Sequence, residues 1–141
     1  MRGEGCLEAY VGARGILESY RKARRGRQIP GDDELSQFQS LLDAAARSDA
    51  AADLLDQTAD LIGAGIANLI NLFNPERVVL GGWTGLLLGQ KLLPRIRESA
   101  RDNALPHPYS QAGIELCGLR RSRCSRRRHP AGGGPALRSP D

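Results

Sequence analysis

Few side chains in this sequence have the chemistry of a metal site. The cysteines are Cys6, Cys117 and Cys124, and the two histidines, His107 and His129, each stand beside a proline. A structural zinc ion takes four thiolate or imidazole ligands, which occur in closely spaced groups along a chain. The widely separated cysteines show no such spacing. Their odd number also argues against a disulfide framework and favours a reducing cytoplasm as the location.

Two consecutive glycines, Gly81 and Gly82, mark a second position where a ligand could be held. They directly follow the apolar run at 78–80, which predicts a short buried strand. Ligands of open α/β sheets collect beyond the carboxyl ends of the strands, and a backbone without side chains lets a ligand approach closely. A structural turn explains the pair equally well, so both interpretations stay open.

The elements that would position these residues follow from apolar periodicity. Apolar side chains recur every three or four residues in four segments, which predicts helices over 7–20, 33–45, 50–72 and 86–103. Asp32 or Asp33 would cap the second helix, and Pro75 would end the third. Apolar runs at 78–80 and 114–117 predict two strands, and Pro106 and Pro108 predict a loop over 104–110.

A strand, a helix and a second strand in this order predict a parallel pair with a crossover helix. The fold class is therefore α/β and helix-rich. Two strands make a poor sheet on their own, which suggests part of a larger fold. Gly63, Ala64 and Gly65 in the longest helix are small enough for another element to press against them. A free-standing oligomerisation module, with this helix packed on a second copy, is one alternative function.

The 141 residues have room for one domain, and the net charge of +4 is unevenly divided along it. Residues 1–119 carry 13 basic and 15 acidic side chains, whereas residues 120–141 carry seven arginines and one aspartate. The second segment, rich in proline and glycine, predicts a disordered basic tail that trypsin cuts first. Its charge could attract phosphates, but a solvated end is the stronger interpretation. No apolar run has the length of a membrane span or a signal peptide.

Two stretches resemble the ROK family, which comprises bacterial repressors, open reading frames and sugar kinases. The segment at 5–10, Gly-Cys-Leu-Glu-Ala-Tyr, is similar to the end of the family's cysteine-rich signature. The segment at 61–82 is similar to the family's long helix and following strand. The resemblance covers residues 5 to about 118, so we expect a partial ROK C-terminal lobe over 1–119. It implies an actin-like, ribonuclease H-like ATPase fold.

The resemblance implies a metal and a sugar role near the N-terminus. Cys6 matches a zinc-ligating cysteine of the signature, but Met1 and Arg2 stand where a further cysteine and a glycine are expected, so the site is incomplete. Glu8 matches a glutamate that accepts hydrogen bonds from sugar hydroxyls, a task that suits a carboxylate. The alternative for Glu8 is an exposed first-turn residue that complements the helix dipole.

By the same resemblance, Gly81 and Gly82 lie near the adenosine of ATP in the kinases. Trp83 follows where the kinases often carry a further glycine, and a bulky indole there favours a regulator over a kinase. A ROK kinase also carries an Asp-x-Gly-x-Thr phosphate loop and a catalytic aspartate, and neither motif is found in this sequence. We therefore expect no catalytic residue in the chain, although the parent family includes ATP-dependent sugar kinases.

A ROK repressor begins with a winged helix-turn-helix, and no segment ahead of Gly5 would form one. The expected function is that of a truncated ROK protein, a remnant of a sugar-responsive transcriptional repressor. The alternative is a fragment of a glucokinase-like, ATP-dependent sugar kinase. Zinc, ATP, a sugar or sugar phosphate effector and homo-oligomers belong to an intact parent, and no cofactor is expected for this chain.

DNA would be bound only through an N-terminal domain, and no membrane contact is expected. From Arg120 onward, arginine, serine, proline and glycine replace the closing apolar helix of the family, as a shifted reading frame in a GC-rich gene would produce. A native basic tail is the alternative.

Overall fold

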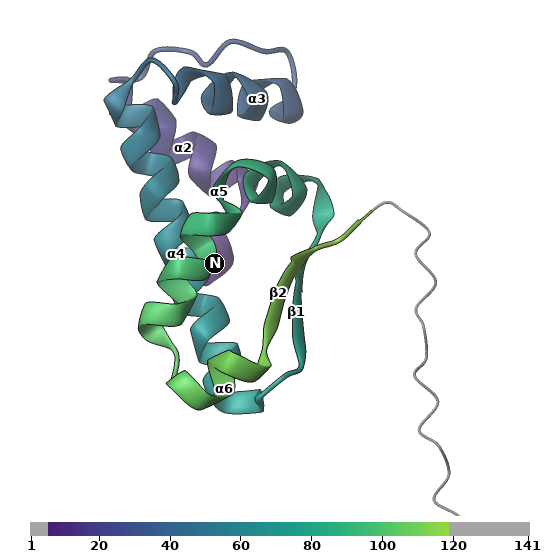
Figure 1. Ribbon diagram of the computed structural model, residues 1–141. Helices are drawn as coiled ribbons and strands as arrows, with labels where there is room; N and C mark the ends of the chain where they lie inside the picture. Colours follow the sequence, from purple (N-terminus) through teal and green to yellow (C-terminus); the bar gives the residue numbers. More distant parts are fainter. Residues whose placement is uncertain (1–5, 119–141) are drawn as a thin grey trace, which may run out of the picture.

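The computed structural model describes residues 6–118 (Figure 1). The tail expected at 120–141 lies outside these residues. The described elements, in chain order, are α1 (Leu7–Val11), α2 (Ala13–Ala23), α3 (Glu34–Ala44), α4 (Asp49–Phe73), β1 (Arg77–Leu80), α5 (Gly82–Asn103), α6 (Pro106–Gln111) and β2 (Gly113–Leu116). No helix among them is long and apolar enough to cross a membrane.

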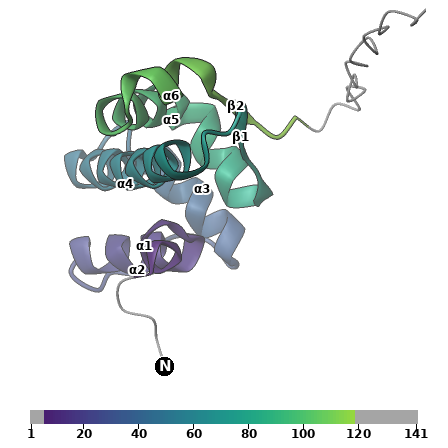
Figure 2. The same ribbon diagram turned by 90° about the horizontal axis from the view of Figure 1, so that it is seen from below.

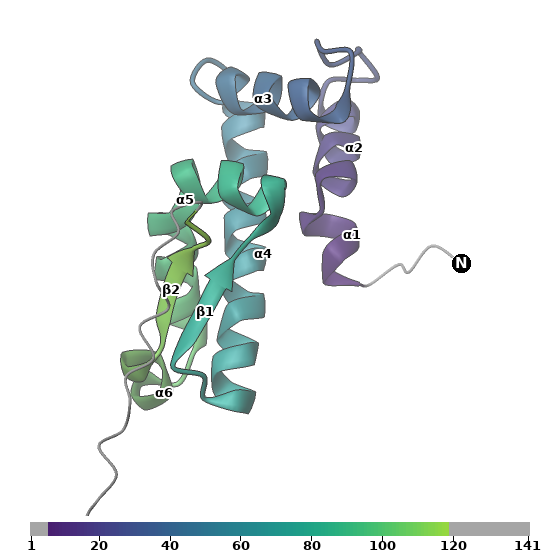
Figure 3. The same cartoon turned by 90° about the vertical axis from the view of Figure 1, so that its right-hand side faces the viewer.

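The long helix α4 is the centre of the molecule. Figure 2, viewed along α4, shows α1 and α2 on one side of it and α5 with α6 on the other. Figure 3 shows the two strands lying against α5 and α4, with α3 across one end. Buried apolar residues form two groups, one where α2, α3 and the start of α5 meet α4, and one between α4, α5 and β2. The largest side chains that are entirely excluded from solvent are Phe38 in the first group and Ile70 and Ile96 in the second, each 0% exposed.

The small residues of α4 are used for close packing inside the chain. A β-carbon on Gly63 would lie 2.5 Å from Cβ of Ser99 and 2.8 Å from the carbonyl oxygen of Ile96, both in α5. Two residues later in α4, a β-carbon on Gly65 would lie 2.7 Å from a methyl group of Leu7 in α1. The expectation that another element presses on these glycines is confirmed. Both partners belong to this chain, so these two positions are not free for a second copy.

The two strands pair in parallel, as predicted. Arg77 lies opposite Gly113 and Leu80 opposite Leu116, with α5 as the connection. Ile114 is buried against the helices, and its carbonyl oxygen accepts a 2.6 Å hydrogen bond from Nη2 of Arg97 in α5. The strands therefore rest on α5, which places the ends of both strands at the start of that helix.

Three boundaries differ from the sequence prediction. The first helix is interrupted at Gly12, whose extended backbone (ψ 153°) separates α1 from α2. Helix α5 starts at Gly82 rather than near residue 86, because glycine adopts the positive φ of 72° required there. The loop expected over 104–110 contains α6, since Pro106 and Pro108 fall in its first turn, where backbone N–H groups have no helical partner.

Asp33, one of the two predicted caps, is the N-cap of α3. Its carboxylate accepts a 2.7 Å hydrogen bond from the backbone N–H of Ser36, and Ser36 Oγ accepts one from the backbone of Asp33. Hydrogen bonds from the side chain and backbone of Ser36 hold the pKa of Asp33 below the ordinary value of 3.8. The charged form of Asp33 is therefore the one that stabilises the start of α3.

We expect Asp33→Ala to destabilise the fold at neutral pH and to lose that effect in acid. Because the folded pKa is lowered, the stabilisation is fully present above pH 3.8 and disappears as the pH falls through the folded value. Urea unfolding of both proteins across this range measures the difference. Asp32→Ala removes the same charge from a residue with no described hydrogen bond, and it serves as the control. An equal, pH-independent loss in both variants would contradict the role of the cap.

Candidate functional site

Cys6 and Glu8 lie together at the start of α1. Cys6 is the N-cap and is exposed, and Glu8 is an exposed residue of the first turn. Within residues 6–118, no side-chain hydrogen bond or ion pair engages the Glu8 carboxylate, so its oxygens are available to hydroxyl donors. Within the same range, no three histidine, cysteine, aspartate or glutamate side chains gather closely enough to hold a metal ion. The described surroundings of Cys6 do not form a zinc site.

Gly81 and Gly82 lie at the carboxyl ends of both strands. The backbone N–H of Cys117, just past β2, donates a 2.8 Å hydrogen bond to the carbonyl oxygen of Leu80. A β-carbon on Gly81 would meet only Cβ of Cys117, at 3.7 Å, and one on Gly82 would have nothing within 4 Å. Among residues 6–118, no side chain except that of Cys117 lies against either glycine, so the bare backbone leaves room for a ligand to approach. The positive φ of Gly82 supports the structural explanation as well.

Trp83 anchors the start of α5 to α3. Its indole meets the ring of Phe38 edge to face, with centroids 5.6 Å apart and an interplanar angle of 86°. Aromatic pairs prefer this arrangement because the positive ring edge faces the negative ring face. The indole nevertheless remains 41% exposed, immediately after the two glycines. A large aromatic surface therefore stands beside the open strand edge.

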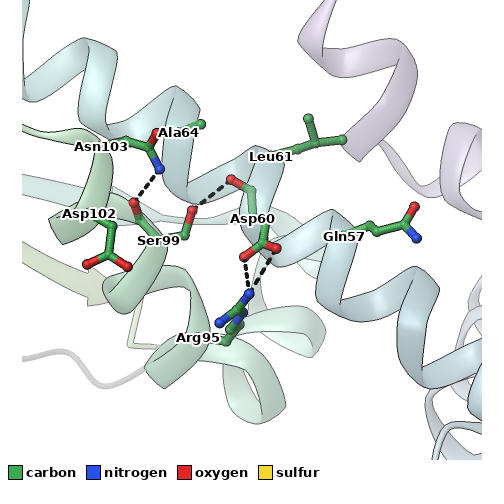
Figure 4. A pocket seen from close by; sticks show the side chains of 8 residues that line it. All are labelled: Gln57, Asp60, Leu61, Ala64, Arg95, Ser99, Asp102 and Asn103. Carbon is green, nitrogen blue, oxygen red and sulfur yellow. Dashed lines mark hydrogen bonds and ion pairs between the residues drawn. The ribbon is translucent and has the colours of Figure 1, made fainter.

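A groove lies between α4 and α5, well separated in sequence from all four predicted site residues. It has a volume of about 590 Å³, and the residues lining it are Gln57, Asp60, Leu61, Ala64, Arg95, Ser99, Asp102 and Asn103. Figure 4 shows Arg95 and Asp60 facing each other across it, with an N–O distance of 2.9 Å. Asp60 and Glu98 raise the pKa of Arg95 above its ordinary value through these contacts.

Four polar residues of the groove interact with each other, namely Asp60, Arg95, Ser99 and Asn103. Ser99 Oγ donates to the carbonyl oxygen of Asp60 at 2.9 Å, and the Asn103 amide donates to the carbonyl oxygen of Ser99 at 2.8 Å. The bond from Ser99 and the ion pair between Arg95 and Asp60 tie α4 to α5, whereas the Asn103 bond lies within α5. Together they account for the groove as packing. Sequence reasoning missed it because Asp60 and Arg95 lie 35 residues apart, with no local pattern to link them.

The structure thus brings the predicted site residues into two separate groups. Cys6 and Glu8 share α1, while Gly81 and Gly82 share the sheet edge with Cys117. The sequence model of the ROK family matches residues 3–116. The chain belongs to the ROK family.

Known proteins similar to this ROK chain include kinases and repressors. A glucokinase of Thermotoga maritima is 32% identical over 109 residues, which are 72% of this chain and 34% of that protein. A xylose repressor of Caldicellulosiruptor bescii is 28% identical over 122 residues, or 82% of this chain and 30% of that protein. A glucokinase of Halalkalibacterium halodurans is 34% identical, over 82% and 37% respectively. The ROK chain thus spans about a third of the length of these curated relatives.

A solved structure agrees with this assignment. The crystal structure of a ROK family transcriptional regulator, a homologue of the E. coli MLC protein, superposes with a TM-score of 0.60 at 25% identity. The match covers 79% of this chain and 29% of that one. The ROK chain therefore contains part of the actin-like ATPase fold, helix-rich with a two-stranded parallel sheet, as expected from the resemblance.

Proposed function

We propose that this chain is part of a sugar-responsive transcriptional repressor of the ROK family. The observation that carries the proposal is the position of Trp83. Its half-exposed indole, held by Phe38, stands directly after Gly81 and Gly82, where a nucleotide would approach a kinase. A regulator has no need of that nucleotide. The sugar would be held through the unengaged carboxylate of Glu8 on α1, by charge-assisted hydrogen bonds from its hydroxyls.

The similar proteins add support at a coarser level. The solved structure is a transcriptional regulator, and the xylose repressor matches 82% of this chain. The alternative is that the chain is a fragment of a sugar kinase. Its 32% and 34% identity to two glucokinases favours this alternative. The open backbone at Gly81 and Gly82 suits that alternative.

The single tryptophan of the chain provides the test, because its fluorescence reports on this edge alone. We expect millimolar ATP with magnesium to leave the emission of Trp83 unchanged once absorption by ATP is corrected with free N-acetyltryptophanamide. We also expect no ADP formation from ATP with glucose, N-acetylglucosamine or xylose. Saturable quenching by ATP, or turnover above a protein-free blank, would favour the kinase alternative.

A second observation separates the two parents without relying on the isolated chain. The genomic DNA upstream of the Met1 codon, read in all frames, would encode a helix-turn-helix under the repressor proposal. An Asp-x-Gly-x-Thr loop there would instead support the kinase.

A further inference from the structure

Five cationic side chains gather at the end of α2 and in the turn that follows it. They are Arg21, Lys22, Arg24, Arg25 and Arg27, and we call them the α2 basic cluster. The turn lies at the end of the molecule opposite α6, as Figures 1 and 3 both show. All five side chains reach solvent, and Arg24 is the only one that is half-buried. Nothing in the sugar or nucleotide proposals uses this surface.

The cluster sits on a defined turn. The backbone N–H of Gly26 donates to the carbonyl oxygen of Arg21 at 2.9 Å, and the N–H of Arg25 donates to that of Lys22 at 3.0 Å. These two bonds form the Schellman motif, which commonly ends helices. A third bond, from the N–H of Arg27 to the carbonyl oxygen of Arg24 at 3.2 Å, extends the turn. The cationic groups are therefore attached to a fixed backbone.

The charges of the cluster are largely uncompensated. Within the described chain, Lys22 alone has a carboxylate neighbour, Glu18 at 3.7 Å, and that side chain of Lys22 is 77% exposed. Arg21 donates to the neutral amide of Gln37 at 2.9 Å, and Arg24 lies over the ring of Tyr20. Asp32, Asp33 and Glu34 follow in sequence, but they open α3 and form no described ion pair with the cluster.

Other arginines of the chain are paired differently. Arg77, Arg95 and Arg101 each have a carboxylate oxygen within 3.5 Å. Arg14, Arg47 and Arg97 have no carboxylate partner within residues 6–118 either, but they stand singly in the sequence. What distinguishes the end of α2 among the described residues is that several unpaired cations occur together, which marks a surface suited to an anionic partner.

Arg25 occupies a backbone conformation that disfavours it. Its φ is 54°, in the left-handed region, at the position of the Schellman motif that glycine usually fills. A glycine is available one residue later, at Gly26, which is also left-handed with φ of 78°. An arginine held where glycine would be less strained points to a use for its side chain.

We propose that the α2 basic cluster binds the phosphate backbone of nucleic acid. Guanidinium groups present planar pairs of donors that match phosphate oxygens, and closely spaced cations displace the counterions of a duplex. A lipid surface is the weaker match, because the only apolar side chain between residues 21 and 28 is the single methyl group of Ala23, which is too small to insert into it. The proposal goes beyond the expectation that DNA is bound only through an N-terminal domain, and it requires no sequence specificity.

The test compares three variants of the full chain that remove the same charge from different places. The cluster variant is Lys22→Gln, Arg25→Gln, Arg27→Gln; the body control is Arg77→Gln, Lys91→Gln, Arg101→Gln; and the tail control is Arg126→Gln, Arg127→Gln, Arg128→Gln. Binding of a short fluorescein-labelled DNA duplex is followed by anisotropy between about 50 and 200 mM salt. All the replaced side chains within residues 6–118 are exposed, so circular dichroism should show unchanged folding.

We expect the cluster variant to lose about tenfold or more in affinity at low salt, with the salt dependence reduced by about 2 to 3 units of slope. The body control should stay within about twofold of the parent chain. The proposal is overturned if the parent shows no salt-dependent binding, if the cluster and body variants weaken equally, or if the tail control alone loses binding. Anionic vesicles bound through the cluster, with no binding of the duplex, would also overturn it.

The variant Arg25→Gly separates an effect on duplex binding from an effect on stability. Glycine relieves the left-handed strain, so the melting temperature should hold or rise while duplex binding weakens. If Arg25→Gly binds the duplex as well as the parent does, Arg25 does not contribute as proposed.

Discussion

Replacement of Phe38 by alanine is expected to lower the free energy of unfolding by about 3 to 5 kcal/mol. Phe38 is 0% exposed, and it is the largest fully buried side chain where α2, α3 and α4 meet. Alanine would leave a cavity and would also remove the ring against which Trp83 packs. Since small domains are stable by only about 5 to 15 kcal/mol, this one change removes a large part of the total. Urea unfolding followed by far-ultraviolet circular dichroism measures it.

Leu35→Ala is the matched control, because Leu35 lies one turn earlier on the same helix and is 43% exposed. Its replacement should cost less than about 1 kcal/mol, since little apolar surface is uncovered. In Phe38→Ala, emission from Trp83 should also shift toward that of a solvated indole. Equal losses in the two variants would mean that α3 is not packed as described.

Gly63→Ala is expected to lower the free energy of unfolding by about 1 to 3 kcal/mol, although alanine is the better helix former. The added methyl group would fall 2.5 Å from Cβ of Ser99 and 2.8 Å from the carbonyl oxygen of Ile96. The second atom belongs to backbone and cannot move aside alone. The two longest helices must therefore separate, and the hydrogen bond from Ser99 to Asp60 is strained with them. Thermal unfolding would show the loss as a lower midpoint.

Gly85→Ala makes the same substitution inside α5, at a position with room for it. A β-carbon there would be 3.8 Å from the nearest atom, the carbonyl carbon of Leu80, which is ordinary contact. Helix propensity then dominates, and the variant should be more stable by up to about 1 kcal/mol. If both alanines stabilised the protein, the close contact at Gly63 would be refuted.

The order of elements could be predicted because the apolar pattern of each is local. The long helix α4, the strand after Pro75 and the parallel partner at Ile114 all follow from periodicity and from the connection between them. The wrong predictions also concerned short stretches of sequence. Pro106 and Pro108 read as a loop, but a first helical turn tolerates proline.

Contacts across the chain could not be predicted in the same way. Phe38 and Trp83 lie 45 residues apart, and Asp60 and Arg95 lie 35 apart, so only the folded chain brings each pair together. The small size of Gly63 predicted that something would pack on it, but sequence could not say that Ser99 would.

The candidate site depends on both kinds of information. Gly81 and Gly82 were identified from their position after a predicted strand and Glu8 through the family resemblance, and their roles remain proposals. The structure adds that the Glu8 carboxylate is unengaged within the described residues and that the glycine edge is open. The α2 basic cluster was visible in the sequence only as a charged run. The fixed turn and the absence, among the described residues, of ion pairs at its arginines could be recognised only from the structure.

The parallel pairing of β1 and β2 has a consequence for the order of folding. Arg77 and Gly113 are 36 residues apart, and the whole of α5 lies between them. Closing a loop of that length costs conformational entropy, which packed helices must offset first. We therefore expect the sheet to form after α5 has docked on α4, so that strand contacts are absent from the transition state. Substitutions at Ile114 would then accelerate unfolding and leave the folding rate almost unchanged, which corresponds to φ-values near zero.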